Sequence, residues 1–218
     1  MGQDPGSAAR APATLAGPES DVALRDGATV HIRPVRPGDE ERLLAFLRGL
    51  SQESRTLRFF SPAIDLVAEA RRESAVADGR RLGLVATVGP EEEIAAHALC
   101  IALDGRRAEV ALTVGDAHQG QGLGTLLLGQ LAEAAAAGGL DTFEADVLAA
   151  NHRMLDVFRQ SGFPLEVREY LCLTLTLDHD LIDGAPAARF ARRLTELIES
   201  GAGLPDQARV PAGGAAPR

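Results

Sequence analysis

Hydrophobic and polar residues alternate along the chain with two periods, and these periods predict a mixture of strands and helices. Alternation with a period of two predicts strands, over residues 28–35, 81–88, 94–103, 108–114, 142–148 and 170–177. Apolar residues spaced three and four apart predict helices, over residues 39–50, 51–60, 62–76, 125–137, 151–162 and 187–200. No internal repeat is visible, so the pattern favours one mixed domain with strands and helices interleaved.

Turn and cap residues mark where several of the predicted strands and helices begin and end. Pro37-Gly38-Asp39 begins the first helix, Asp104-Gly105 joins two strands as a hairpin, and Gly138-Gly139 ends the long helix. Both ends of the chain are rich in Ala, Gly and Pro and lack periodicity. We therefore expect a disordered tail over residues 1–20, a folded domain over 21–180, a helical extension over 181–200 and a second disordered tail over 201–218.

Composition excludes several classes of protein. The 218 residues carry a net charge of -9, which argues against nucleic acid as a partner. No apolar run approaches the length that spans a bilayer, and no secretory signal stands at the N-terminus, so we expect a cytoplasmic protein without a membrane partner. Cys100 and Cys172 lie in apolar strand patterns and are interpreted as buried hydrophobic residues, with no metal site implied.

The most informative segment is a glycine-rich loop between a strand and a helix. The apolar strand that ends at Val114 runs into a loop with glycine at positions 120, 122 and 124, and the long helix follows at once. Such a loop turns several backbone N–H groups toward one point, and the helix adds partial positive charge there. The segment therefore predicts a site for a phosphate or pyrophosphate group.

Three kinds of phosphate loop compete for this segment. The ATP-type loop requires a lysine, and all 22 cationic side chains of the chain are arginine. The dinucleotide fingerprint needs glycine where Thr125 stands, although Glu144 lies near the position of a ribose-binding acid. The third pattern is Q-x-x-G-x-G, which Gln119, Gly122 and Gly124 satisfy. It resembles the pyrophosphate loop of the GNAT superfamily of acetyl-CoA-dependent N-acetyltransferases.

A second segment strengthens this resemblance. Asn151, Met154, Phe158 and Gly162-Phe163 stand at the spacing of the helix that follows the loop in the GNAT superfamily. Asn151 is suited to cap that helix. The resemblance implies the GNAT fold, in which a mixed, mostly antiparallel sheet of 6–7 strands is flanked by helices and splayed at the acetyl-CoA site.

Further upstream, the chain resembles the catalytic domain of bacterial protein lysine acetyltransferases of the Pat type. The residues that carry this resemblance are Ile32-Arg33-Pro34, Gly38-Asp39, residues 50–54 and Arg58-Phe59-Phe60. It implies acetyl-CoA as co-substrate and a protein lysine as acceptor. Acetyltransferases of small amines, such as amino acids, polyamines or aminoglycosides, remain an alternative. The chain is expected to act as a monomer or homodimer.

The resemblance also implies which residues hold acetyl-CoA. Backbone groups of the strand before the loop would contact the pantetheine arm, through Leu112, Thr113 and Val114. Backbone groups of the loop would hold the pyrophosphate, through Gln119, Gly120, Gln121, Gly122, Leu123, Gly124 and Thr125. Asn151 would contact the cofactor arm and Phe158 would pack beside it. A bulge in the strand would leave the N–H of Val114 free to face the thioester oxygen.

Acetyl transfer requires a group that removes a proton from the attacking amine, because a lysine amine is protonated at neutral pH. Glu109 stands on the strand before the loop, where glutamate is the general base in similar acetyltransferases; its alternative is an ion pair with Arg106 or Arg107. Phe158 departs from the family, because a tyrosine that protonates the leaving thiolate often stands there. This departure keeps open a non-catalytic acyl-CoA-binding module.

Overall fold

The structure, a computed structural model, describes residues 15–24, 27–61, 63–75, 79–169 and 184–200. The chain divides into two units, Met1–Glu166 and Val167–Arg218. The first unit holds the sheet and the helices α1 to α5, and the second holds α6 (Gly184–Glu199). The strand predicted over residues 170–177 lies outside the described residues.

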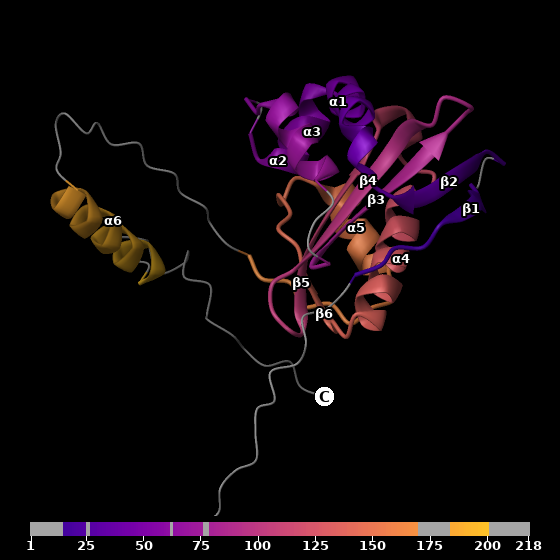
Figure 1. The fold of residues 1–218 in the computed structure, drawn as a ribbon. Coiled ribbons are helices and arrows are strands. Elements are labelled where there is room, and N and C mark those ends of the chain that lie inside the picture. Colours follow the sequence, from indigo (N-terminus) through magenta and orange to yellow (C-terminus); the bar gives the residue numbers. More distant parts are fainter. Residues whose placement is uncertain (1–14, 25–26, 62, 76–78, 170–183, 201–218) are drawn as a thin grey trace, which may run out of the picture. The chain divides into compact units, whose positions relative to one another are not determined.

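A six-stranded sheet forms the centre of the first unit, with its strands in sequence order (Figure 1). Its strands are β1 (Ser20–Ala23), β2 (Thr29–Pro34), β3 (Arg81–Val88), β4 (Glu93–Ala102), β5 (Arg107–Val114) and β6 (Thr142–Glu144). Neighbouring strands pair antiparallel from β1 to β5, whereas β5 and β6 pair parallel. The mixed, mostly antiparallel sheet that the sequence predicts is confirmed.

Helices cover both faces of this sheet. Between β2 and β3 lie a 3₁₀ turn and three helices, η1 (Pro37–Asp39), α1 (Glu40–Gly49), α2 (Gln52–Phe59) and α3 (Leu66–Ser74). After β5 come a second 3₁₀ turn and two helices, η2 (Asp116–His118), α4 (Leu123–Ala137) and α5 (His152–Gln160). In the described part of the chain, no helix is long and apolar enough to span a membrane.

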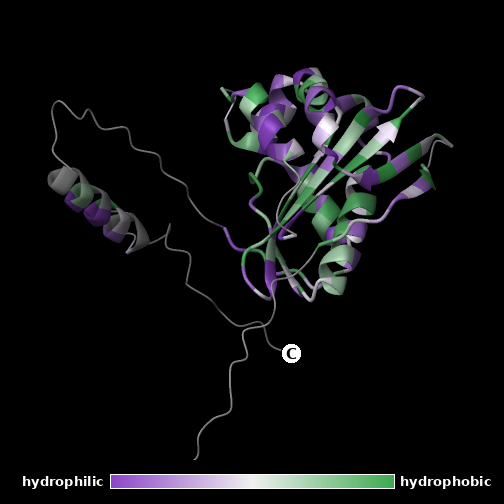
Figure 2. Ribbon diagram, in the orientation of Figure 1, coloured by the Kyte–Doolittle hydropathy of each residue, from purple (hydrophilic) through white to green (hydrophobic). Residues whose placement is uncertain are grey.

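Alternation along the strands divides the core into two clusters. Leu82, Leu84 and Ala86 of β3 pack in the cluster that α4 and α5 cover, whereas Val85 packs with α1 and α3. Because successive side chains of a strand point to opposite faces, these clusters lie on opposite sides of the sheet. Figure 2 shows hydrophobic residues prevailing along the central strands and α4. The helices α1 to α3 therefore form one layer, and α4 with α5 the other.

The predicted elements differ most from the observed ones in three places. The strand expected over 142–148 ends at Glu144, because Ala145 to Ala150 leave the sheet. The helix expected over 62–76 is shorter, since Asp65 caps it by accepting hydrogen bonds from the amides of Val67 and Ala68. The sequence did not predict β1, which pairs with β2. Upstream of β1, Leu15 packs in the core.

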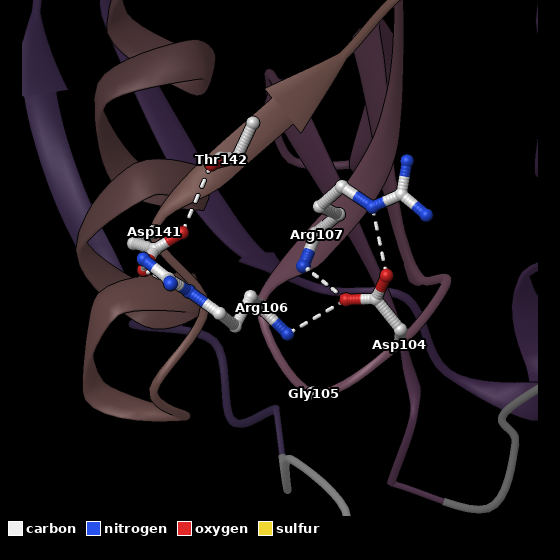
Figure 3. Close-up of a pocket in the computed structure, with 6 residues that line it drawn as sticks. All are labelled: Asp104, Gly105, Arg106, Arg107, Asp141 and Thr142. Atoms are coloured by element: carbon white, nitrogen blue, oxygen red, sulfur yellow. Dashed lines mark hydrogen bonds and ion pairs between the residues drawn. The ribbon is translucent and has the colours of Figure 1, made fainter.

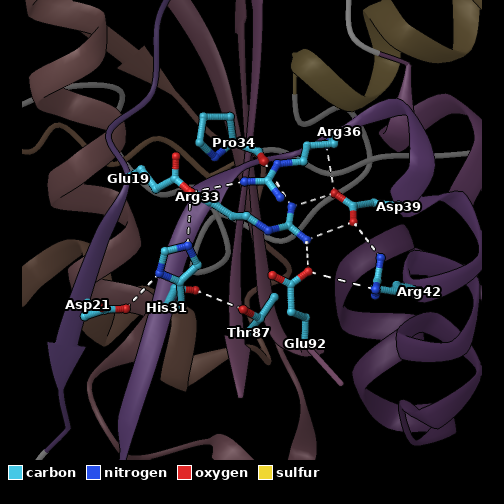
Figure 4. Close-up of polar contacts among 10 residues, drawn as sticks. All are labelled: Glu19, Asp21, His31, Arg33, Pro34, Arg36, Asp39, Arg42, Thr87 and Glu92. Atoms are coloured by element: carbon cyan, nitrogen blue, oxygen red, sulfur yellow. Dashed lines mark hydrogen bonds and ion pairs between the residues drawn. The ribbon is translucent and has the colours of Figure 1, made fainter. Parts of the chain in front are cut away.

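A buried ion pair joins the sheet to the first helical layer (Figure 4). The guanidinium of Arg33 on β2 donates two hydrogen bonds to the carboxylate of Asp39, at 2.7 and 2.9 Å. Both side chains are almost fully buried. Asp39 also accepts a hydrogen bond from the Arg36 amide, and Arg33 donates to Glu92 in the β3–β4 turn. This pair fixes where α1 begins relative to β2.

Candidate functional site

The glycine loop predicted from the sequence connects η2 to α4, and two of its glycines have a positive φ. The φ of Gly120 is 76° and that of Gly122 is 91°, a region that disfavours residues with a Cβ atom. Gly122 is also the residue that caps α4. These two glycines therefore set the backbone path into the helix.

Gly124 also has a packing role, which the sequence did not predict. A Cβ atom added there would lie 3.2 Å from a methyl carbon of Val157 on α5. Gly124 is buried in the first turn of α4, so its missing side chain allows α4 and α5 to approach closely. The third glycine of the pattern thus serves helix packing.

The amides of the loop have no acceptor within the described part of the chain. No N–H from Gln119 to Thr125 donates a hydrogen bond to a described residue, and the first that does so is Leu126, to the oxygen of Gly122 at 3.0 Å. No side chain caps α4, and no acidic residue stands in its first turn. These amides and the positive end of the helix dipole make the loop suited to an anion with several oxygens.

The strand β5 has an open edge next to this loop. Two hydrogen bonds show which backbone groups of β5 face β4. The amide of Gly115 donates to Ala95 O at 2.8 Å, and the amide of Leu103 donates to Arg107 O at 2.9 Å. In an antiparallel pair of strands, the backbone N–H and C=O groups of successive residues point alternately toward the partner strand and away from it. Those of Val110, Leu112 and Val114 consequently face away from β4, on the side where β6 pairs only as far as Glu109.

Of the three strand residues expected to contact the pantetheine arm, two have backbone groups that face the open edge and one does not. Backbone groups of Leu112 and Val114 face the open edge, and the carbonyl of Val114 accepts a hydrogen bond from Gln119 Nε2 at 3.3 Å. Thr113 lies opposite His97 of β4, so its backbone groups face that strand.

The bulge expected in β5 is not there. The strand pairs with β4 in continuous register from Ala108 to Val114, and a register shift occurs instead between Ala86 and Thr87, where β3 pairs with β4. The N–H of Val114 nevertheless faces away from β4, because the backbone groups of successive residues in β5 alternate in direction. It meets no strand there, because β6 pairs with β5 only as far as Glu109.

Glu109 lies at the fork where β5 and β6 separate. It is opposite Glu144 in the last residue pair of the two strands, and its side chain is exposed. The carboxylate has no hydrogen bond or ion pair with any residue that the structure describes, and Arg72 of α3 is near enough to interact electrostatically. Among the described residues, Glu109 is therefore a carboxylate without a bonded partner, beside the open edge.

The arginines expected as alternative partners of Glu109 bind other residues (Figure 3). Arg106 pairs with Asp141, and Arg107 pairs with Asp104 at 2.7 Å and with Glu144 at 2.8 Å. Hydrogen bonds from the Arg106 amide, then from the Arg107 side chain and amide, lower the pKa of Asp104 to about 2. A surface hollow of about 460 Å³ lies here, at the opposite end of β5 from the glycine loop. Its arginines are already neutralised by carboxylates, so it offers no free charge to a ligand.

The helix α5 carries the two remaining predicted residues. Asn151 caps it, because its Oδ1 accepts a hydrogen bond from the Met154 amide at 3.1 Å. Phe158 is partly buried and packs against the core that α4 covers. Tyr170, the single tyrosine of the chain, lies outside the described residues.

A carboxylate that the sequence did not single out links the loop to α2. Asp116 of η2 accepts hydrogen bonds from the Ser51 amide and from the hydroxyls of Ser51 and Ser54, at 2.8, 3.0 and 2.7 Å. Burial alone would raise the pKa of Asp116, but these hydrogen bonds outweigh it and hold the pKa below its ordinary value. Its partners are more than sixty positions away in the sequence, so local patterns gave no signal for them.

A buried polar group lies under α3. His97 Nδ1 is 3.2 Å from Glu73 Oε2, and both side chains are almost fully buried. Arg58 of α2 donates a hydrogen bond to the other carboxylate oxygen of Glu73 at 3.0 Å. Burial lowers the pKa of His97, although the attraction of Glu73 opposes this. His97 belongs to the layer that joins α2 and α3 to β4.

Neither metal ligation nor thiol chemistry is favoured in the part of the chain described above. No group of three or more His, Cys, Asp or Glu residues there is arranged to hold a metal ion. Burial raises the pKa of the Cys100 thiol to about 12, so this thiol stays protonated and unreactive. Cys172 lies outside the described residues.

Comparison with families of known proteins gives one match over most of the first unit. A model described as "Acetyltransferase (GNAT) family" matches residues 47–163, a range that includes β5, the glycine loop and α5. A model described as "2-oxoacid dehydrogenases acyltransferase (catalytic domain)" matches residues 143–204. Residues 170–183 and 201–204 of that second range lie outside the described residues, and the range contains neither Glu109 nor the loop.

The curated proteins that are similar to the chain include two acetyltransferases. Acetyltransferase Pat of Mycolicibacterium smegmatis is 33% identical over 168 residues, which cover 76% of this chain and 50% of that protein. Acetyltransferase PA5475 of Pseudomonas aeruginosa is 30% identical over 148 residues, 65% of this chain and 78% of that protein. The chain thus spans half the length of Pat and most of the length of the second relative.

Solved structures share the fold. The GNAT domain of S. lividans PAT matches with a TM-score of 0.62 and 36% identity, over 68% of this chain and 89% of that chain. Spermidine N-acetyltransferase from Vibrio cholerae, solved with CoA and spermine, matches with a TM-score of 0.52 over 63% of this chain and 82% of that chain. Its identity of 16% supports a common fold only.

Proposed function

The chain belongs to the GNAT family of N-acetyltransferases, and on that premise we propose that it transfers an acetyl group from acetyl-CoA to lysine side chains of proteins. The observation that carries this proposal is the row of amides from Gln119 to Thr125 at the start of α4, none of which donates to a described residue. It lies directly after the open edge of β5. A ligand that joins a diphosphate to an extended arm needs both features. The negative charge of the diphosphate requires hydrogen-bond donors, and the amides of the arm pair with a strand edge.

Each part of this site would then bind one part of acetyl-CoA. Amides of the loop would hold the diphosphate, and backbone groups of Leu112 and Val114 would bind the pantetheine arm as a neighbouring strand would. Acetyl-CoA supplies an acyl group activated as a thioester. The N–H of Val114 faces the open edge and is our candidate to donate a hydrogen bond to the thioester oxygen.

Glu109 is the residue to which we assign the proton transfer. An amine must lose a proton to attack the thioester carbon, and a carboxylate reached directly or through one water can accept it. The amine nitrogen then bonds to the carbonyl carbon, the carbon–sulfur bond breaks, and coenzyme A leaves as a thiolate. Because a thiol has a pKa of about 8.5 in solution, the thiolate can leave without an acid at Phe158.

The acceptor is tested by incubating the protein with acetyl-CoA and either a lysine-rich protein or a panel of small amines. The chain contains no lysine, so acetyl-lysine found by mass spectrometry belongs to the substrate. We expect acetylated protein lysines together with released coenzyme A. Acetylated small amines without modified protein would instead show a small-amine acetyltransferase, and binding without thiol release would show a non-catalytic module.

The conformation of Gly122 gives a prediction for cofactor affinity. Gly122→Ala places a Cβ atom at a φ of 91°, which costs about 1–2 kcal/mol and should weaken binding of coenzyme A about 5- to 30-fold. Gly129→Ala is the matched control, because it lies within α4 and its added Cβ would meet nothing within 4 Å. Calorimetric titration of both variants checks this. Equal affinities would contradict the role of the loop.

A further inference from the structure

Asp116 is the centre of a polar network that connects three elements around the loop. Its carboxylate binds Ser51 and Ser54, which stand at the beginning of α2. Ser51 is also the cap of α2, because its hydroxyl accepts a hydrogen bond from the Ser54 amide at 3.1 Å. The carboxylate of Asp116, next to the glycine loop, thus holds the beginning of α2, which belongs to the helical layer on the opposite face of the sheet from α4.

Gln119 extends the same network into the loop. Its Nε2 lies 3.3 Å from Ser54 Oγ, 3.3 Å from Val114 O and 3.5 Å from Asp116 Oδ1. Its Oε1 accepts a hydrogen bond from Arg153 of α5. Gln119 is also the first residue of the row of amides at the start of α4. A ligand bound to these amides therefore restrains a residue that already contacts α2, β5 and α5.

The helix α2 lies beside β5, on the face of the sheet that carries Glu109 and Thr113. Its last turn carries Arg58, which binds Glu73 and through it His97. No side chain of α2 is fully buried, and Phe59 packs partly buried against the core cluster of α1 and α3. Polar contacts also hold the helix at its two ends, with Asp116 at the beginning and Glu73 near the end.

We propose that Asp116 is a positioning residue, which transmits binding of coenzyme A at the glycine loop to α2. The proposal rests on the proposed function. When the loop is occupied, Gln119 and η2 are restrained, and Asp116 then holds Ser51 and Ser54 more firmly. The consequence is an α2 that is held more firmly beside the acyl end of the site when the co-substrate is present. Such coupling between two sites is commonly worth about 5- to 150-fold in an equilibrium.

Hydrogen exchange with and without coenzyme A tests this proposal. In the natural protein, saturating coenzyme A should slow exchange in peptides covering Gln119–Thr125 and also, by about five- to tenfold, in peptides covering Gln52–Phe59. In Asp116→Asn, the loop should still be protected, but the effect on α2 should disappear. The asparagine keeps the size of the side chain but loses one acceptor oxygen and the charge.

Two further variants make the result specific. Ser54→Ala removes one hydrogen bond to Asp116 and should reduce the ligand-dependent protection of α2 without abolishing it. Asp141→Asn changes an aspartate that pairs with Arg106, at the other end of β5, and should leave the protection of α2 unchanged. A merely structural role for Asp116 would lower the melting temperature but would leave the ligand-dependent part of the exchange intact.

Two outcomes overturn the inference and leave the proposed function standing. One is protection of the loop without any effect on α2 in the natural protein, and the other is equal protection of α2 in Asp116→Asn. If coenzyme A protects neither segment in the natural protein, the proposed function itself fails, and this inference fails with it. If Asp116→Asn does not fold, Ser54→Ala provides the same comparison.

Discussion

Replacing Glu109 with glutamine is expected to lower the turnover number about 10²- to 10⁴-fold while leaving the affinity for coenzyme A unchanged. Glutamine keeps the shape of the side chain but cannot accept a proton at neutral pH. The carboxylate has no hydrogen bond or ion pair in the described part of the chain, so its loss should not disturb the fold. Steady-state rates and a calorimetric titration of the variant check both parts of this result.

Glu144→Gln is the matched control for this experiment. Glu144 is the residue opposite Glu109 across the β5–β6 pair, but its carboxylate is already bound to Arg107 at 2.8 Å. We expect this variant to keep most of its activity. If Glu109→Gln turned over at the natural rate, or if both variants lost activity equally, Glu109 would not be the base.

Replacing Asp39 with asparagine is expected to destabilise the fold by about 3–5 kcal/mol at neutral pH, because the buried guanidinium of Arg33 then keeps only the partly exposed carboxylate of Glu92 as counter-charge. The two residues form two hydrogen bonds, at 2.7 and 2.9 Å, in a place almost without solvent exposure. Chemical denaturation of the natural protein and the variant measures the difference in the free energy of unfolding.

The same ion pair makes this difference depend on pH. Burial by itself raises the pKa of Asp39, but hydrogen bonds from Arg33 and from the Arg36 amide outweigh burial and lower the pKa below 3.8. The stability that Asp39 contributes is therefore present above its unfolded pKa and lost as the pH falls through the lower folded value. The natural protein and Asp39→Asn should converge in stability below about pH 4.

A double variant separates the ion pair from the rest of the fold. Replacing Arg33 with methionine and Asp39 with leucine removes both charges together, and buried pairs replaced in this way often lose little stability. We expect the double variant to be more stable than Asp39→Asn. A double variant as unstable as the single one would mean that the pair acts through more than its charge.

The sequence predicted those elements whose residues repeat with one clear period. The strand Arg81–Val88 was predicted with its observed ends, and the helix predicted over 51–60 exceeds α2 by one residue at each end. The strand β1 was missed because its four residues are too few to show alternation. The strand β6 was predicted too long, because apolar residues continue past Glu144 after the backbone has left the sheet.

Within the site, the sequence predicted the residues better than their orientation. Periodicity tells which face of a sheet a side chain occupies, but the direction of the backbone bonds depends on how β5 pairs with β4. Periodicity therefore could not show that the backbone groups of Thr113 face β4, whereas those of Leu112 and Val114 face the open edge. The contacts of Asp116 with Ser51 and Ser54 join distant segments, and no local pattern indicates them.

The central claim is that the amides from Gln119 to Thr125 bind the diphosphate of coenzyme A. Calorimetric titration of the folded protein with coenzyme A, and separately with pantetheine, which lacks the diphosphate, tests it most directly. We predict saturable binding of coenzyme A and binding of pantetheine that is weaker by about 100-fold or more, since charge-assisted hydrogen bonds are lost. No heat from coenzyme A, or equal affinity for pantetheine, would contradict the claim.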